Sequence, residues 1–482
     1  MASSTVERMF DTLPDADVVD AMSAAARAQN AQCARELAAI GELYARRAPA
    51  DDVDRFNWAV DGHENVVAEV AAGLRISRGR AAGRLRYAIA LRERLPRVAE
   101  VFARGDIDFR VMAALVFRSE LIEDAGLIAR LDAAVARHAR GWMRLSGPKL
   151  IERIDMWVAR IDPGGLRVPG QRTQDRYVEI DATSPGLAAV WAQLQATDGA
   201  ALDRKLDAVA ATVCRDDPRT RAQRRADALG ALAAGSDLLR CLCGVPDCPA
   251  AQRPSNTNMV VHVLAEQSAI NGESQAPGYL AGFGPLPAAL LRDLAGVAKS
   301  KPVSLPPDRA EAGYRPSTAL AAFIRFRDLT CRFPGCDAPA DVCDVDHTVP
   351  FPLGPTHPSN LKLLCRHHHL LKTFWTEWRD KQLPDGTVEW TSPSGRSYVT
   401  KALGSMYFPA LSIPTGVLAL PAEQPPAAGD RAVMMPVRRR TRAEDHAARV
   451  RRERGINEAR IAAEAARHAG RSAPHNNDPP PF

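Results

Sequence analysis

A dense cluster of cysteine and histidine residues between positions 331 and 372 constrains this chain more than any other feature. This stretch holds four of the chain's 9 Cys and five of its 11 His. Two short-spaced ligand pairs joined by a longer loop are typical of a tetrahedral zinc site, because each tight turn presents two ligands. The sequence therefore predicts a structural Zn²⁺ site with four ligands: Cys331, Cys336, Cys365 and His368.

A second set of polar residues, which the zinc site does not need, is interleaved with these ligands. It consists of Asp346, His347, Asn360, His369 and Lys372. In the stretches DVDH, SNLKLLC and CRHHHLLK, the layout resembles that of the HNH nucleases, a ββα-metal family. In that family an Asp-His pair and a downstream Asn precede a C-x2-C/H-H-x2-K motif.

The resemblance implies a role for each of these residues. His347 would be the general base that activates water, and Asn360 would orient its imidazole. Asp346 and His369 would hold a catalytic divalent cation, Mg²⁺ or Mn²⁺, against the scissile phosphate. The chemistry agrees, because a neutral imidazole accepts a proton near pH 7 and a metal ion offsets charge that builds up on a phosphate. We therefore expect a metal-dependent endonuclease acting on DNA. The alternative is a zinc-stabilised nucleic-acid-binding or mobile-element protein without nuclease activity.

Some details of the motif leave alternatives open. The second ligand pair ends in His368, where many members of the HNH family have Cys. Cys365 with His368 fits the family spacing, but on a helix His369, at i+4, also shares a face with Cys365. His367, at i+2, points away and is the least favoured ligand. We interpret Cys343 as a buried strand thiol rather than a fifth ligand, since free Cys is among the most buried residue types.

Local patterns around the motif predict its secondary structure. Val342–His347 alternates and predicts a strand, Thr348–Ser359 has four Pro and one Gly and predicts a loop, and His367–Phe374 can begin a helix. Upstream, Ser317 is the predicted N-cap of the helix TALAAFIRFRD. Downstream, a hairpin is predicted around Pro384-Asp385-Gly386. Its Trp side chains are compatible with stacking on nucleic-acid bases, but core packing across the strands is favoured.

Residues 15–160 are predicted to form a helical domain, because apolar residues recur there at helical spacing, for example at Leu131 and Val135. Within it, Ser77 would cap a helix that is similar to the second helix of a helix-turn-helix. That helix carries four arginines: Arg78, Arg80, Arg84 and Arg86. An ordinary solvated arginine face is the favoured interpretation, because the sequence signature of that motif is weak.

The middle of the chain has two clear strand candidates, Arg176–Asp181 and Met259–Leu264. Between them, Ser184-Pro185 is expected to begin a helix. Three further cysteines resemble a metal knuckle that lacks an obvious fourth ligand, and His262 is the nearest His. They are Cys241, Cys243 and Cys248. Plain thiols in a turn are therefore favoured over a second zinc site.

These patterns predict an α+β protein with a mainly helical N-terminal domain that contains a small sheet, and a C-terminal zinc-stabilised ββα-metal (HNH) domain. The expected parts are a helical domain (1–165), a small α+β region continuing it (166–266), a linker region with one helix (267–316), the nuclease domain (317–405), and a Pro/Ala-rich and then Arg-rich tail (406–482). The arrangement resembles a repeat family of high-GC bacteria, in which a helical domain of unknown function precedes an HNH module.

Charge and cysteine usage bear on partners and compartment. The stretch 431–482 contains 12 Arg against 6 Asp plus Glu, a net of +6 that equals the +6 of the whole chain. It is expected either to contact phosphates without sequence preference or to be a disordered solubilising tail. An odd number of Cys in short-range sets favours reduced thiols. With no signal-peptide pattern and no apolar run of membrane-spanning length, we expect a cytoplasmic protein that binds DNA and not a membrane.

Overall fold

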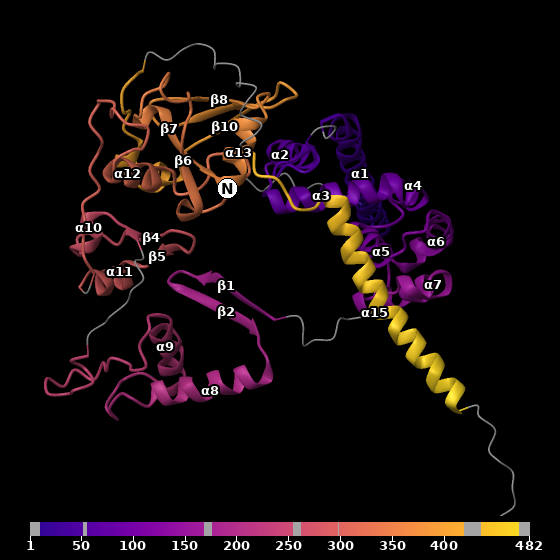
Figure 1. Cartoon of the computed structure of the whole chain (residues 1–482), viewed down its shortest axis with the longest axis horizontal. Helices are drawn as coiled ribbons and strands as arrows, with labels where there is room; N and C mark the ends of the chain where they lie inside the picture. The colour runs from indigo at the N-terminus through magenta and orange to yellow at the C-terminus, as the bar shows by residue number, and fades with distance from the viewer. Residues whose placement is uncertain are drawn as a thin grey trace, which may run out of the picture. The chain divides into compact units, whose positions relative to one another are not determined.

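The computed structural model describes residues 10–51, 55–167, 176–253, 262–296, 298–418 and 435–471. The chain divides into two compact units, whose elements are labelled in Figure 1. Unit 1 comprises Met1–Val168, Pro306–Ala338 and Val342–Phe482, and unit 2 comprises Pro169–Leu305 and Pro339–Asp341. Each unit combines helices with small antiparallel sheets, so the expected α+β class is confirmed. No helix among the described residues is long and apolar enough to cross a membrane.

The N-terminal part of unit 1 is a helical bundle, as the apolar periodicity predicts. Its elements are α1 (Asp15–Asp51), α2 (Gly62–Leu74), α3 (Arg78–Glu93), α4 (Pro96–Ala103), α5 (Phe109–Ser119), α6 (Ala125–His138), η1 (Ala139–Trp142), α7 (Gly147–Ile161) and η2 (Pro163–Gly165). Asp61, Asp108 and Asp124 begin α2, α5 and α6 by accepting a hydrogen bond from the backbone amide three residues later. The predicted apolar positions Leu131 and Val135 are buried in one continuous core.

Two of the four arginines of α3 form ion pairs within the protein, and the other two are exposed. Arg78 forms an ion pair with Glu64 at 2.8 Å, and Arg84 forms one with a glutamate of α1 at 2.9 Å. Arg80 and Arg86 are exposed. Only part of the expected arginine face is therefore available to a partner.

The C-terminal part of unit 1 carries two small antiparallel sheets, β6-β7 and β10-β9-β8. The elements in this region are α12 (Thr318–Asp328), β6 (Cys343–His347), η4 (Pro358–Asn360), β7 (Leu361–Cys365), α13 (Arg366–Phe374), β8 (Arg379–Gln382), β9 (Val388–Thr391), β10 (Ser397–Thr400), α14 (Leu403–Tyr407) and η5 (Pro409–Ser412). The short helix η3 (Ala340–Val342) precedes β6, and its first two residues are assigned to unit 2. Ser317 caps α12 by accepting from the amide of Leu320. The predicted hairpin is present as β8 and β9, and Trp375, Trp378 and Trp390 are at most 1% exposed. The tryptophans therefore pack in the core.

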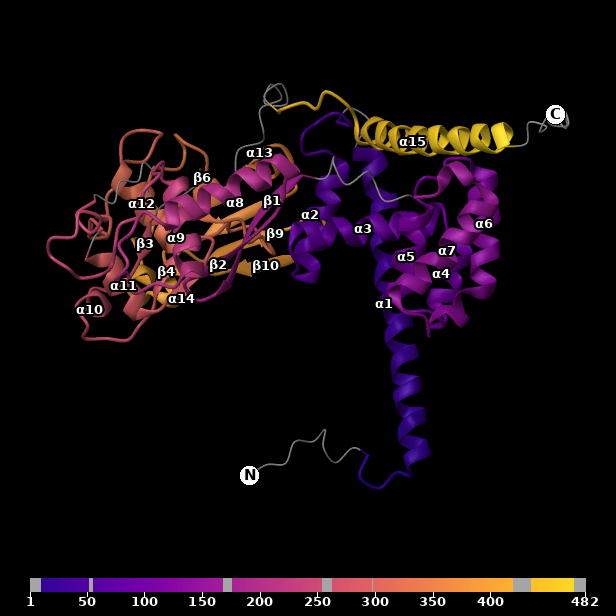
Figure 2. The ribbon, with the colours of Figure 1, turned by 90° about the horizontal axis from the view of Figure 1, so that it is seen from below.

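Helix α15 (Arg442–Arg471) belongs to unit 1 and lies along the helical bundle (Figure 2). Arg454 forms an ion pair with Asp162 at 2.6 Å, and Arg442 forms one with Asp61 at 2.5 Å. Residues 442–471 of the tail therefore form a helix, and several arginines of this helix bind the protein itself.

Within its described residues, unit 2 contains a hairpin, a three-stranded sheet and four helices. Its elements are β1 (Tyr177–Ser184), β2 (Leu187–Gln193), α8 (Ala196–Ala210), α9 (Arg221–Ala233), β3 (Val263–Leu264), α10 (Gln267–Ile270), β4 (Gly278–Leu280), β5 (Gly284–Leu286) and α11 (Ala288–Ala295). β1 pairs with β2, and the order of the other sheet is β3-β4-β5.

Two predictions for this region are wrong. The helix expected after Ser184-Pro185 is instead the strand β2, because Pro185 and Gly186 form a tight turn, with Gly186 at φ 82°, that returns the chain as a hairpin. The segment 267–316 is more than a linker with one helix, since it also holds α10, β4 and β5. Very short strands that contain Gly and Pro are hard to distinguish from loop by pattern. Of the predicted strand Met259–Leu264, residues 259–261 lie outside the described part of the chain.

Candidate metal centre and neighbouring polar site

Strands β6 and β7 and helix α13 form the framework of the candidate site. The two strands pair antiparallel, with His347 opposite Leu361, and α13 begins directly after β7 with Cys365 as its N-cap residue. Residues two apart on a strand share a face, so Asp344 and Asp346 project from the same side of β6. The strand, loop and helix expected over this stretch are present in that order.

The four predicted zinc ligands converge at this framework. The ligand atoms of Cys331, Cys336, Cys365 and His368 lie within 4.8 Å of one another. Nδ1 of His368 is 3.3 Å from Sγ of Cys365 and 3.6 Å from Sγ of Cys331, and the sulfurs of Cys336 and Cys365 are 4.0 Å apart. An ion with Zn–S bonds of about 2.3 Å separates tetrahedral ligand atoms by roughly 3.8 Å, so these spacings fit one zinc ion.

Neighbouring groups hold this quartet in place. Gly335 has φ 78° in the turn between the first two cysteines, and a Cβ there would lie 2.5 Å from the carbonyl oxygen of Ile76, so the turn requires glycine. The ring of Phe333 stacks on His368 with centroids 4.0 Å apart. Burial raises the pKa of the Cys331 thiol. A metal ion would stabilise the thiolate instead. The donor set, in which Cys331 and His368 are buried and the other two cysteines partly buried, therefore fits a closed metal site.

The other Cys and His residues of the motif lie outside the quartet. Nε2 of His367 is 3.4 Å from a carboxylate oxygen of Glu64. Cys343 is buried, and its thiol donates to the carbonyl of Ala338 at 3.5 Å. His369 points toward β6, so the structure brings Cys365 together with His368 rather than with His369.

His369 lies between two carboxylates of β6. Its Nδ1 is 2.9 Å from Oδ2 of Asp344, and its Nε2 is 3.4 Å from Oδ1 of Asp346. An ionised carboxylate only accepts hydrogen bonds, so Nδ1 carries a hydrogen and donates to Asp344. In the neutral ring the lone pair is then on Nε2 and faces Asp346. Metal-binding histidines are commonly oriented by a carboxylate on the other ring nitrogen, and this arrangement has that form.

Two buried lysines compensate the second oxygen of Asp346. Nζ of Lys362 is 2.8 Å and Nζ of Lys372 is 2.7 Å from Oδ2 of Asp346, and Lys362 also lies 2.6 Å from Asp380. Burial alone would raise the pKa of Asp346, but the charges of Lys362 and Lys372 hold it below its ordinary value. Asp346 is therefore ionised at neutral pH, and Oδ1 is the oxygen that faces His369.

His347, at the end of β6, has a defined tautomer. Its Nε2 is 2.9 Å from Oγ1 of Thr356. That hydroxyl has one hydrogen, which it donates to the carbonyl of Gly313 at 2.6 Å, so Nε2 of His347 must be the donor to Thr356. The lone pair of the neutral ring is therefore on Nδ1. Tyr314 stacks on the imidazole, and burial lowers the pKa of His347, which keeps the ring neutral at pH 7.

Asn360 holds the loop after His347 rather than the imidazole itself. Its Nδ2 donates to the carbonyls of Val349 at 3.0 Å and Pro355 at 2.9 Å, and its Oδ1 accepts from the amide of Val349 at 2.8 Å. The resemblance implies that Asn360 orients His347, whereas the hydrogen bonds of its side chain go to the backbone. Asn360 therefore holds the loop that also carries Thr356.

Most of the chain matches one known family. The family described as "Domain of unknown function (DUF222)" matches residues 24–328. The chain belongs to the DUF222 family. Within this DUF222 protein the match ends before Cys331, so the quartet and the β6–β7–α13 framework lie beyond it.

DUF222 relatives resemble this chain over nearly its whole length. The uncharacterized protein Rv3776 of Mycobacterium tuberculosis (strain ATCC 25618 / H37Rv) is 46% identical over 471 residues, which cover 91% of this chain and 90% of the relative. The uncharacterized protein Rv2100 of the same strain is 43% identical over 516 residues, which cover 96% of this chain and 93% of the relative. No solved structure matches the chain.

Three residues of this site in the DUF222 protein were not predicted from the sequence: Asp344, Thr356 and Lys362. Asp344 could have been found from the strand pattern, because it precedes Asp346 by two positions on a predicted strand and so lies on the same face. Lys362 lies opposite Asp346 only in the observed register of β6 and β7. Thr356 reaches His347 because of the fold of the loop between these strands. Neither register nor loop fold can be read from residue spacing.

Proposed function

We propose that this DUF222 protein is a metal-dependent endonuclease of the HNH type that hydrolyses phosphodiester bonds in DNA. The observation that carries the proposal is the pairing of Oδ1 of Asp346 with Nε2 of His369 at 3.4 Å, while Asp344 binds the other ring nitrogen. A carboxylate oxygen and an imidazole nitrogen form a suitable partial ligand set for Mn²⁺, and the carboxylate for Mg²⁺. A cation held there would offset the negative charge that develops on the scissile phosphate.

A general base lies next to this pair in the chain. His347 follows Asp346 directly, and in its neutral tautomer the lone pair is on Nδ1. Because burial lowers its pKa, His347 is neutral at pH 7 and can accept a proton from the attacking water. Thr356 keeps the proton on Nε2, and Asn360 holds the loop that carries Thr356. These two residues position the base without touching the reacting atoms.

Positively charged side chains on the surface of unit 1 are suited to binding DNA. Exposed arginines of unit 1, among them Arg80, Arg86 and Arg452, are available to phosphates of the DNA backbone. The quartet of Cys331, Cys336, Cys365 and His368 would hold a structural zinc ion. Four protein ligands leave no open position for water, so its role is to join the Cys331 turn to α13 rather than to take part in hydrolysis.

A second candidate function is nucleic-acid binding without cleavage. It is favoured by the two lysines on Asp346, because Lys362 and Lys372 already compensate its charge. The polar cluster can therefore be stable without a divalent cation. In that case the quartet would stabilise a module that binds nucleic acid.

A plasmid-nicking assay separates the two candidates. The full-length protein is incubated with supercoiled plasmid and Mg²⁺ or Mn²⁺, with EDTA as the metal-free control. Nicking that requires the metal and is lost in His347→Ala supports the nuclease. The matched control is His446→Ala, which removes a half-exposed histidine of α15 and should nick normally. A protein that binds DNA and does not nick it in either metal favours the second candidate.

A further inference from the structure

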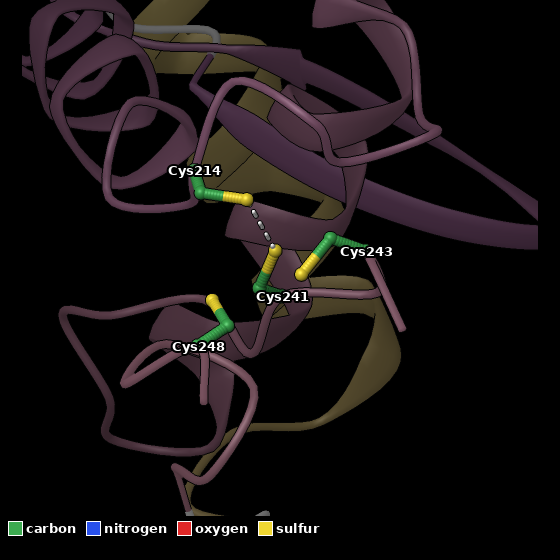
Figure 3. Close-up of side chains that lie close together, drawn as sticks. All are labelled: Cys214, Cys241, Cys243 and Cys248. Atoms are coloured by element: carbon green, nitrogen blue, oxygen red, sulfur yellow. Dashed lines mark hydrogen bonds between the residues drawn. The ribbon is translucent and has the colours of Figure 1, made fainter. Parts of the chain in front are cut away.

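Unit 2 contains a second group of four cysteines that converge on one point (Figure 3). Cys214 comes from the loop between α8 and α9, and the other three come from the stretch CLCGVPDC: Cys241, Cys243 and Cys248. All four sulfurs lie within 4.8 Å of one another, and the sulfurs of Cys214 and Cys241 are 3.4 Å apart. Cys214 is therefore the fourth member that the sequence did not reveal.

The spacing of these sulfurs suits a single bound ion. A disulfide requires sulfurs about 2.0 Å apart, and the four are free thiols in the structure. One zinc ion with four thiolates holds neighbouring sulfurs roughly 3.8 Å apart. Four sulfurs with no separation above 4.8 Å can share such an ion with small adjustments.

The chain turns back on itself around three of these cysteines. The amide of Cys241 donates to the carbonyl oxygen of Ala250 at 2.9 Å, and the amide of Ala251 donates to the carbonyl oxygen of Cys248 at 2.9 Å. Between them Gly244 has φ 70°, a backbone conformation that favours glycine. These turns bring three sulfurs of one short stretch to the same point.

Polar contacts fix the two cysteine-bearing segments to each other. Asp217, close to Cys214 in the chain, accepts from the backbone amide of Leu242, which lies between Cys241 and Cys243. Arg219 holds Asp217 at 2.8 Å and also donates to the carbonyl of Arg240. The sulfurs are therefore brought together by a scaffold that does not depend on the cysteines alone.

The apolar cores next to this scaffold are small. Among the residues that the structure describes, the buried members of one are Val209, Ala228 and Leu239, and those of the other are Cys241, Cys248 and Ala250. A region with so little buried apolar surface commonly depends on a metal ion or disulfides for stability. The cysteine group occupies the second of these cores.

We propose that Cys214, Cys241, Cys243 and Cys248 bind a structural zinc ion that joins the α8–α9 loop to the 241–248 loop of unit 2. Thiolate ligands in a compact four-sulfur group select zinc over hard cations, and four protein ligands make the site closed and structural. This site lies within the residues matched by the DUF222 family and shares no residue with the first quartet. It does not depend on the proposed nuclease activity.

Metal analysis of the full-length chain tests the proposal. The reduced wild type should carry two zinc ions per chain after dialysis against metal-free buffer. Cys214→Ser and Cys331→Ser should each lose one, and Cys343→Ser, which removes a buried thiol outside both groups, should lose none. Wild-type protein with one zinc ion that Cys214→Ser retains would overturn the proposal and leave the first quartet intact.

Thiol protection in the wild type gives a second test that does not depend on how the variants fold. The native protein is alkylated with and without prior treatment with a chelator, and the labelled cysteines are mapped by mass spectrometry. Cys214 and Cys243, which are only partly buried, should be protected until the chelator removes the metal, whereas Cys33 should be labelled in both samples. Labelling of Cys214 and Cys243 at the rate of Cys33 without chelator, or their recovery as disulfides, would also overturn it.

Discussion

The indole nitrogen of Trp378 donates a 2.9 Å hydrogen bond to Oδ1 of Asn65, 313 residues away in the chain. Trp375 makes a second bond of this kind to the carbonyl oxygen of Val60, also at 2.9 Å. The two indoles are 1% exposed. The C-terminal part of unit 1 and the helical bundle therefore share a buried polar and aromatic contact. A substitution in one of them should change the stability of the other.

Replacing Trp378 by Phe should lower the free energy of unfolding by about 2 kcal/mol, because it removes the donor to a buried amide oxygen and some buried apolar volume. Denaturant unfolding measures this effect. Trp191→Phe, at an indole that is 61% exposed, should change it by less than about 0.5 kcal/mol. A double-mutant cycle with Asn65→Ala isolates the hydrogen bond, and additive effects would contradict it.

Replacing Cys331 by Ser should remove one bound zinc ion and destabilise unit 1 by more than about 2 kcal/mol, because binding to a closed metal site contributes directly to folding. Cys343→Ser is the matched control, since that thiol is buried nearby and lies outside the quartet. Zinc content and thermal unfolding are measured together. Equal zinc content in Cys331→Ser and wild type would refute the assignment.

The first quartet could be predicted because each half of it is local. Cys331 and Cys336 lie in one turn, and Cys365 is the N-cap residue of α13 close to His368. Spacing therefore shows which residues can meet, although it leaves His369 open as an alternative to His368. Cys214 could not be predicted, because all of α9 lies between it and Cys241. The contact between Trp378 and Asn65 is equally hidden, since no sequence pattern links residues so far apart.

The direction of the chain after a turn was also hard to predict. Ser184-Pro185 is compatible both with a helix start and with a tight turn, and the outcome depends on whether the following residues pair with β1. The alternation of apolar residues in β2 is too short to decide. Long periodic stretches such as α6 were predictable because many residues support the same assignment.

Glu64 should make unfolding sensitive to pH. Burial raises its pKa, but the charges of His367, Arg442 and Arg78 outweigh burial and lower the pKa to about 2. Since the folded pKa is below the unfolded value of about 4.3, its stabilisation is full above that pH and is lost as the pH falls toward 2. Burial lowers the pKa of His367 to about 4, so that ring is neutral at pH 7 and only the two arginines remain charged beside Glu64. The difference between wild type and Glu64→Gln should therefore be on the order of 2 kcal/mol at pH 7 and shrink below pH 4.5. Parallel stability curves for the two proteins would contradict this.

Two neighbouring arginines of α15 should behave differently. Arg454→Ala should destabilise unit 1 by about 2 kcal/mol, because it leaves the buried carboxylate of Asp162 without its partner. Arg452→Ala, at an exposed position, should change the free energy of unfolding by less than about 0.5 kcal/mol.

The same variant tests a contact with DNA. If Arg452 contacts a DNA phosphate, its loss should reduce the slope of log K for DNA binding against log salt concentration by about 0.9. An unchanged slope would exclude Arg452 from the contact.

The roles of the two site histidines should separate in metal titrations. Under the proposed nuclease mechanism His347→Ala removes the proton acceptor, so it should bind DNA and the divalent cation but lose cleavage by a factor of at least about 100.

His369→Ala removes the nitrogen that faces Asp346 at 3.4 Å, so it should lose affinity for the cation. High Mg²⁺ or Mn²⁺ should then recover part of its activity by mass action. Asp344→Asn, which weakens the hydrogen bond that orients His369, should show a smaller shift in the same direction. Zinc content should be normal in all three variants, because none of these residues belongs to the quartet. Cleavage by each variant is measured against metal concentration. Rescue of His347→Ala by extra metal, or loss of zinc from His369→Ala, would show that the roles are assigned to the wrong residues.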